Sequence, residues 1–389
     1  MTMVIRFRGH IRAIAWMVLI ATLCAGVATA QQTIDGVTAD GALYRFLVPS
    51  SWNGQLVVYA HGYVSAGDPI ALPNTPIEQA AFQAITSQGF AVAMSSYAEN
   101  GWAVKNGAQT THQLRGLFAA QVSNPIRTYL VGTSEGGLIA LDLTEGHPGQ
   151  YDGTLSICGV VGGTPVTFQH NGDGRVLFDY FFPGVLPGDL LHMPNLDFSP
   201  GSPTYNAVLN ALVGGLFAPG QPTLQFANVA GLPGSNVNEI IFSGLTLAGA
   251  YSSFNELLQR TTGHNFYDNT ETVYLGSAND AALNAGVQRY SADQAGVNYV
   301  AHYYDPNGYL RMPTLTLHTT QDPTISFSQE ALYAAVVAGA NASDFLVQQS
   351  VNRYGHCNVK PEEILNSFQG LFLWVNYGIK PAGGDVTVP

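Results

Sequence analysis

The chain has 389 residues, of which 46% are apolar and only 10% are charged. Acidic residues outnumber lysine and arginine by 26 to 14, which gives a formal net charge of −12 and argues against nucleic acid as a partner. The length suits one large core with an insertion.

Residues 1–30 have the pattern of a secretory signal peptide. Three arginines precede an apolar run that is too short to span a membrane comfortably, and Ala-Thr-Ala at 28–30 offers a cleavage site. A membrane anchor is the alternative interpretation. We therefore expect a secreted or periplasmic protein with no stable membrane insertion after signal cleavage; the sequence leaves its oligomeric state open.

Beyond the signal, apolar runs of strand length alternate with segments of helical periodicity. This alternation predicts an α/β fold with a mostly parallel central sheet flanked by helices. The predicted strands lie within 42–62 (two, joined by a turn at 51–54), 90–97, 127–132 and 151–163, and the helices between them lie within 77–89 and 106–122.

The alternation stops near residue 162 and resumes near residue 311. The stretch between is rich in glycine, proline, asparagine and aromatic residues and offers no convincing buried strand, so we predict a mainly helical insertion with a long helix at 236–260. Its aromatic run at 178–182 suggests an apolar pocket. Strands are predicted again within 311–325 and 344–359, and helices within 328–340 and 361–378.

The segment Gly132-Thr133-Ser134-Glu135-Gly136 fits G-x-S-x-G between a predicted strand and a predicted helix. A sharp strand-to-helix turn exposes the serine hydroxyl, and the small residues Gly132 and Gly136 avoid clashes there. An ordinary glycine-rich turn is the alternative. We predict Ser134 as a nucleophile, with the amide of Glu135 at the helix start directed at a developing oxyanion.

A second oxyanion donor is expected from His61-Gly62-Tyr63, which ends an earlier apolar strand. Gly62 would let the backbone approach the substrate, and the amide of Tyr63 would be the donor. We expect His61 to be a structural residue that orients this loop. The Glu135 side chain is expected to tune the local field or to meet substrate.

A serine nucleophile needs a base, and the base needs a carboxylate that fixes its tautomer. His356 follows the last predicted strand, and Asp322 follows the preceding one in "TTQDPTI". We predict these two as base and acid, although Asp322 could also be a turn aspartate before a proline. His318 lies on a predicted strand and is expected to be packed.

Three cysteines are present, and one of them lies in the predicted signal. The remaining pair, Cys158 and Cys357, predicts one disulfide in an exported chain, which would clamp the loop of His356. Two separate buried thiols are the alternative.

These motifs resemble the α/β-hydrolase superfamily, in which "VVYAHGY", "YLVGTSEGG", "TLTLHTTQDPTI" and "YGHC" would occur in the same order. The resemblance implies a secreted bacterial-type serine esterase with a catalytic triad of Ser134, Asp322 and His356. It also implies a core of 31–162 and 311–389 and a cap or lid of 163–310. The His-Cys pair is partly similar to the tannase and feruloyl esterase branch, but Thr133 stands where that branch has cysteine.

The favoured function is hydrolysis of a small-molecule or polymeric carboxylic ester through an acyl-enzyme, for which we expect neither cofactor nor metal. A prolyl-aminopeptidase-like serine peptidase is the alternative. That activity would need clustered carboxylates in the insertion, whose acids Asp179, Asp189, Glu239 and Glu256 are scattered. A non-catalytic binding protein on the same scaffold is the third possibility.

Overall fold

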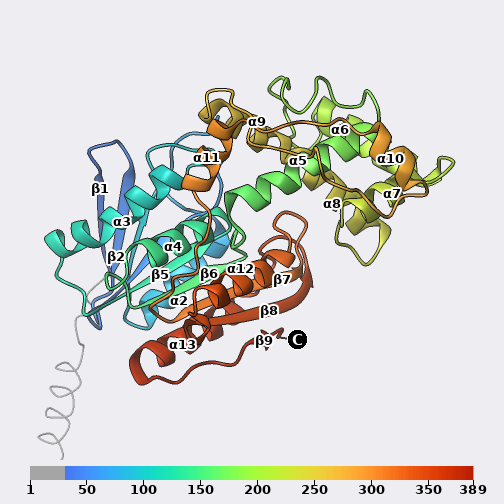
Figure 1. The fold of residues 1–389 in the computed structure, drawn as a ribbon. Coiled ribbons are helices and arrows are strands. Elements are labelled where there is room, and N and C mark those ends of the chain that lie inside the picture. The colour runs from blue at the N-terminus through green and yellow to red at the C-terminus, as the bar shows by residue number, and fades with distance from the viewer. Residues whose placement is uncertain (1–30, 389) are drawn as a thin grey trace, which may run out of the picture.

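The computed structural model describes residues 31–388, so the predicted signal peptide lies outside the described residues. Their strands form one sheet in the order β1-β2-β4-β3-β5-β6-β7-β8-β9, antiparallel at β1–β2–β4 and parallel elsewhere (Figure 1). The strands are β1 (Gln32–Val37), β2 (Leu43–Val48), β3 (Gln55–Ala60), β4 (Ala91–Ser95), β5 (Arg127–Thr133), β6 (Gly153–Ile157), β7 (Thr314–Gln321), β8 (Leu346–Tyr354) and β9 (Gly384–Asp385).

Helices cover both faces of this sheet, which explains why β3, β4 and β6 are buried along their whole length. On β3, Val57 and Tyr59 pack in one cluster with α2 and α13, while Leu56 and Val58 pack in another with α3 and α4. The helices of the core are α2 (Pro76–Ser87), α3 (Val104–Gln121), α4 (Glu135–Gly146), α12 (Ser328–Gly339) and α13 (Pro361–Tyr377).

Between β6 and β7 the chain forms helices and no strand, and these helices lie together beyond one edge of the core (Figure 1). They are α5 (Gly163–Phe181), α6 (Pro203–Phe217), α7 (Pro222–Val229), α8 (Val237–Gly249), α9 (Tyr251–Arg260), α10 (Asp280–Gly286) and α11 (Gln294–His302). Phe178 and Phe182 are buried against Phe226. Phe178 and Phe182 therefore belong to the core of the helical unit, whereas Tyr180 and Phe181 are half-buried against it.

Two strands lie within 42–62 and are joined by a turn, as predicted, but they are not neighbours in the sheet, because β4 lies between β2 and β3. The prediction of one helix at 236–260 was wrong, because the segment forms two helices, α8 and α9, which meet at Ala250 and both pack on α5. The edge strands β1 and β9 were not predicted, and their residues are mostly exposed. Within 31–388 no helix is both long and apolar enough to cross a membrane.

Candidate active site

The turn from β5 into α4 holds Ser134 in a strained backbone conformation, with φ 57° and ψ −122°. For a residue other than glycine, this φ costs free energy, and the conformation persists only where the surrounding structure imposes it. A Cβ on Gly132 would overlap the carbonyl oxygen of Gly136, and one on Gly136 would overlap that of Ala60. The two glycines are therefore required for the turn to pass so close to β3.

Ser134, His356 and Asp322 form a continuous chain of hydrogen bonds at the carboxyl ends of β5, β7 and β8. His356 Nε2 lies 2.9 Å from Ser134 Oγ, and His356 Nδ1 lies 2.7 Å from Asp322 Oδ2. The imidazole is partly exposed and the aspartate is buried. The structure thus brings together three residues that the sequence analysis selected from separate segments.

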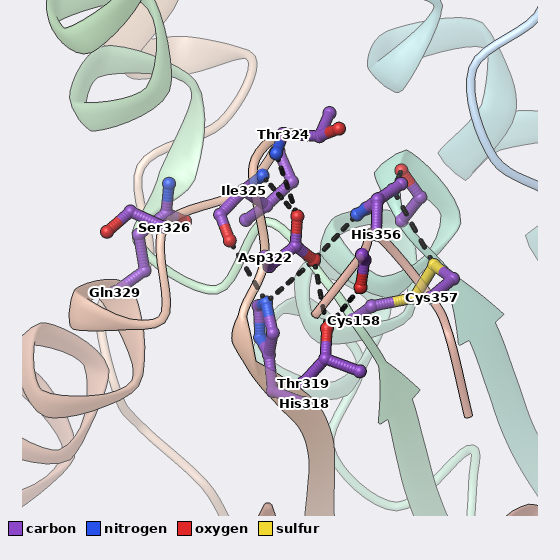
Figure 2. Close-up of polar contacts among 12 residues, drawn as sticks. Cys158, His318, Thr319, Asp322, Thr324, Ile325, Ser326, Gln329, His356 and Cys357 are labelled. Carbon is purple, nitrogen blue, oxygen red and sulfur yellow. Dashed lines mark hydrogen bonds and ion pairs between the residues drawn. A yellow bond between two sulfur atoms is a disulfide. The ribbon is translucent and has the colours of Figure 1, made fainter. Parts of the chain in front are cut away.

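The loop after β7 holds Asp322 rigidly. Its Oδ1 accepts hydrogen bonds from the backbone amides of Thr324 (2.8 Å) and Ile325 (3.0 Å), which leaves Oδ2 facing His356 (Figure 2). Burial alone would raise the pKa of Asp322, but hydrogen bonds from His318 and His356 outweigh it and hold the pKa well below its usual range. The carboxylate is therefore ionised when the imidazole needs a partner.

The loop after β3 passes directly over the serine. A Cβ on Gly62 would lie 3.2 Å from Ser134 Cβ, so only glycine fits comfortably, and Tyr63 follows it. His61 is buried, stacks on Tyr97 and donates from Nδ1 to the Gly62 carbonyl at 2.7 Å. Burial lowers the pKa of His61. His61 is thus placed as a neutral support for the loop.

Comparison with known proteins agrees with this architecture. No family model and no curated protein matches the chain. Its structure is similar to that of feruloyl esterase B from Aspergillus oryzae (TM-score 0.50, 13% identity, 90% of this chain and 82% of that chain). It is also similar to that of an esterase from Aspergillus oryzae (TM-score 0.50, 14% identity, 90% and 80%). The chain has the α/β-hydrolase fold.

Within this α/β-hydrolase fold, the side chain of Glu135 points away from solvent. It is fully buried, and its Oε1 accepts a hydrogen bond from the amide of Ala103 at 2.6 Å, just before α3. Burial raises the pKa of Glu135 well above its usual range. Of the two roles expected for this side chain, contact with substrate is disfavoured by its burial in the core, and an influence on the local field stays a prediction. The backbone amide of Glu135 is the first amide of helix α4.

A disulfide joins the exit of β6 to the loop of the histidine. Cys158 and Cys357 are bonded, with Cα atoms 5.3 Å apart and a sequence separation of 199. The Cys357 sulfur lies 3.5 Å from His356 Nε2. Both cysteines have positive φ, 42° and 51°. The three side chains cluster closely, but the sulfurs are bonded to each other and are not available as metal ligands.

Two cavities lie beside the loop after β3. One of about 420 Å³ lies between the sheet and α2 and is mainly apolar. Its lining includes Gly62, and also Thr133 and Cys357, which adjoin Ser134 and His356 in sequence. A larger one of about 670 Å³ lies between the loop after β3 and the helices of the insertion and is more polar. Tyr63 lines both. Sequence reasoning missed the apolar cavity, because its walls come from α2, the loop before it and α13.

Proposed function

We propose that the protein is an exported serine hydrolase that cleaves a carboxylic ester through an acyl-enzyme on Ser134. The observation that carries the proposal is the chain Ser134–His356–Asp322, whose serine stands in a strained strand-to-helix turn. Export is supported by the predicted signal peptide and by the disulfide, which persists in an oxidising compartment.

In the proposed mechanism, Ser134 Oγ attacks the ester carbonyl carbon while His356 Nε2 takes its proton. Asp322 holds the Nδ1–H and stabilises the imidazolium that results. The amides of Tyr63 and Glu135 would bind the oxyanion of the tetrahedral intermediate. His356 then protonates the departing alcohol, and a water activated by the same imidazole releases the acid. No cofactor enters this sequence of steps.

An ester is favoured over an aminoacyl peptide by the state of the acids in the insertion. A free substrate ammonium group needs clustered, unpaired carboxylates, but the four acids considered for that role each have a partner. Asp179 pairs with Arg175 (2.7 Å), Glu256 pairs with Arg260, Asp189 pairs with His192 (3.0 Å), and Glu239 accepts from the amide of Ser235 (2.6 Å). The two solved structures compared above are also esterases.

The cavities suggest how such an ester would lie. The apolar cavity beside Thr133 suits an apolar acyl or aromatic group, and the polar cavity beyond Tyr63 suits a polar leaving group. We propose that residues 163–310 act as a cap over the second cavity, since Tyr251, Ser252 and Glu256 of α9 line it.

The test combines an active-site label with turnover. A fluorophosphonate probe should modify Ser134, located by mass spectrometry, and the protein should hydrolyse p-nitrophenyl esters faster than aminoacyl-anilides. Ser134→Ala should abolish labelling and lower turnover by about 10³-fold or more with the fold unchanged. Ser87→Ala, which removes an exposed hydroxyl at the end of α2, is the matched control. A folded protein that resists the probe would be a binding protein instead.

A further inference from the structure

A second imidazole contacts Asp322 on the side away from His356. His318 is fully buried on β7, and Figure 2 places its ring directly below the aspartate. Its Nε2 lies 3.3 Å from Asp322 Oδ2 and 3.2 Å from the carbonyl oxygen of Ile325. Its Nδ1 lies 3.2 Å from Oε1 of Glu330, at the start of α12. One imidazole thus bridges two carboxyl groups.

The contacts around this ring fix its protonation. Both nitrogens of the His318 ring face oxygen acceptors. A neutral imidazole would therefore direct the lone pair of its unprotonated nitrogen at a lone pair of one of these oxygens. The other carboxyl oxygen of Glu330, Oε2, accepts hydrogen bonds from the hydroxyl of Thr316 (2.6 Å) and from the side-chain amide of Gln348, so Oε1 is the oxygen that faces the ring. An imidazolium between the two carboxyl groups gives each oxygen acceptor around the ring a donor.

We propose that His318, as a buried imidazolium anchored by Glu330, is a positioning residue that orients Asp322 and moderates its charge toward His356. This inference rests on the proposed function, because it assigns the role through the proposed triad. Burial alone would lower the pKa of His318, but the hydrogen bonds to Asp322 and Glu330 outweigh it and raise the pKa to about 9.

The electrostatic consequence has a definite sign. The positive charge of His318 offsets part of the field that Asp322 exerts on His356, so it makes protonation of His356 less favourable. The ionisable groups near the ring are Asp322 and Glu330, with His356 beyond the first and Tyr333 close to the second. A neutral residue at position 318 should therefore move the acid limb of the kcat/KM profile to higher pH.

The first experiment reads the ring directly and does not depend on turnover. Imidazole nitrogen NMR of the full protein, with His318 assigned by loss of its signals in His318→Gln, should show both nitrogens protonated at pH 7 and deprotonation only near pH 9. Glu330→Gln should make deprotonation occur at lower pH. A neutral His318 ring at pH 7 would overturn the proposal even if the protein proves to be an esterase.

The second experiment compares two neutral replacements. His318→Gln keeps an N–H donor near the Nε2 position, toward Asp322, whereas His318→Asn keeps one near Nδ1, toward Glu330. Both should shift the acid limb, and kcat should fall about 10-fold or more in His318→Asn and less in His318→Gln, with KM unchanged. His112→Gln is the control, since His112 contacts Tyr151 and His147 away from the triad.

Outcomes that separate the two proposals are clear. Equal activities and unshifted profiles in both folded variants would refute the positioning role and leave Ser134 as nucleophile. If no variant lost ester turnover, Ser134→Ala included, the proposed function would be refuted. The NMR result would still report the charge on His318. If either variant fails to fold, Glu330→Gln and the NMR titration of the native protein supply the decision.

Discussion

The carboxylate of Asp322 has polar contacts on both of its oxygens. Its Oδ1 accepts from two backbone amides, and its Oδ2 faces two imidazoles. An amide in its place would turn its carbonyl oxygen toward the backbone amides and its NH₂ group toward both rings. His356 Nδ1 would then have to accept, and its proton would move to Nε2, where it blocks removal of the serine proton.

We accordingly predict that Asp322→Asn lowers kcat by up to about 10⁴-fold with little change in fold. Steady-state kinetics with an activated ester, beside circular dichroism of the purified variant, provides the measurement. Asp305→Asn, at an acid near the end of the insertion, is the comparison. Normal turnover in Asp322→Asn with a large loss in Asp305→Asn would mean that the acid has been misplaced.

Glu135 gives a prediction for pH dependence. Its pKa is raised in the folded protein by burial, so above pH 4.5 the folded state holds a proton that the unfolded state has released. The free energy of unfolding must then fall as pH rises from about 4.5 toward the folded pKa, by up to about 1.4 kcal/mol per pH unit. Glu135→Gln removes this titration.

The variant's stability relative to the native protein should therefore increase with pH over that window. Urea unfolding at several pH values from 4 to 8 measures it, and Glu271→Gln, at an exposed acid of the insertion, is the matched control. Parallel stability curves for the native protein and Glu135→Gln would show that the Glu135 carboxyl does not titrate differently on folding.

For single residues, the sequence was sufficient where a local pattern marks the position. Ser134 stands in a G-x-S-x-G turn, and Asp322 and His356 each follow a strand, so strand endings alone located them. His318 was predicted to be buried, and it is, but its charge could not be inferred. Glu330 lies twelve residues away on another element, and only the fold brings the two together. The oxyanion-hole roles of Tyr63 and Glu135 stay predictions.

At the level of helices and strands, one disulfide bond joins the end of β6 to the loop after β8. The disulfide closes a loop of 199 residues, for which the chain-entropy model gives at most about 5 kcal/mol. Both cysteines adopt positive φ, a strain that reduces this figure. Because Cys357 follows His356, the bond also limits how far the imidazole can move from Ser134.

We predict that reduction lowers kcat before the domain unfolds, and that Cys158→Ala/Cys357→Ala reproduces the loss. Turnover and tryptophan fluorescence followed together during titration with a reductant would separate the two events. The double variant, which reductant should not affect, is the control. Simultaneous loss of activity and fluorescence, or two free thiols by mass spectrometry of the exported protein, would contradict the prediction.

Element boundaries were predictable where a strand is buried on both sides or a helix has one apolar face. Strand order was not, because β4 separates β2 from β3 through pairings between distant segments, for which the sequence has no local marker. The break between α8 and α9 was missed for a related reason. Both halves are apolar at helical spacing, and only packing on α5 decides that the chain bends at Ala250.

For the whole molecule, the interruption of strand–helix alternation was the signal that predicted an insertion at 163–310. β6 ends at Ile157 and β7 begins at Thr314, yet the two pair directly in the sheet. Composition alone could not supply the arrangement of the inserted helices, whose aromatic residues form a core of their own. The cavity beside Thr133 was equally hidden, since its walls come from distant parts of the core.

That interrupted sheet sets the order in which the site can be assembled during synthesis. Ser134 and His356 are 222 residues apart, and β7 and β8 add to the sheet beyond β6. The ribosome will have produced β1 to β6 and all the inserted helices before Asp322 and His356 emerge. A nascent chain that ends before residue 356 carries the proposed nucleophile without its proposed base, so on the proposed mechanism it could not hydrolyse an ester.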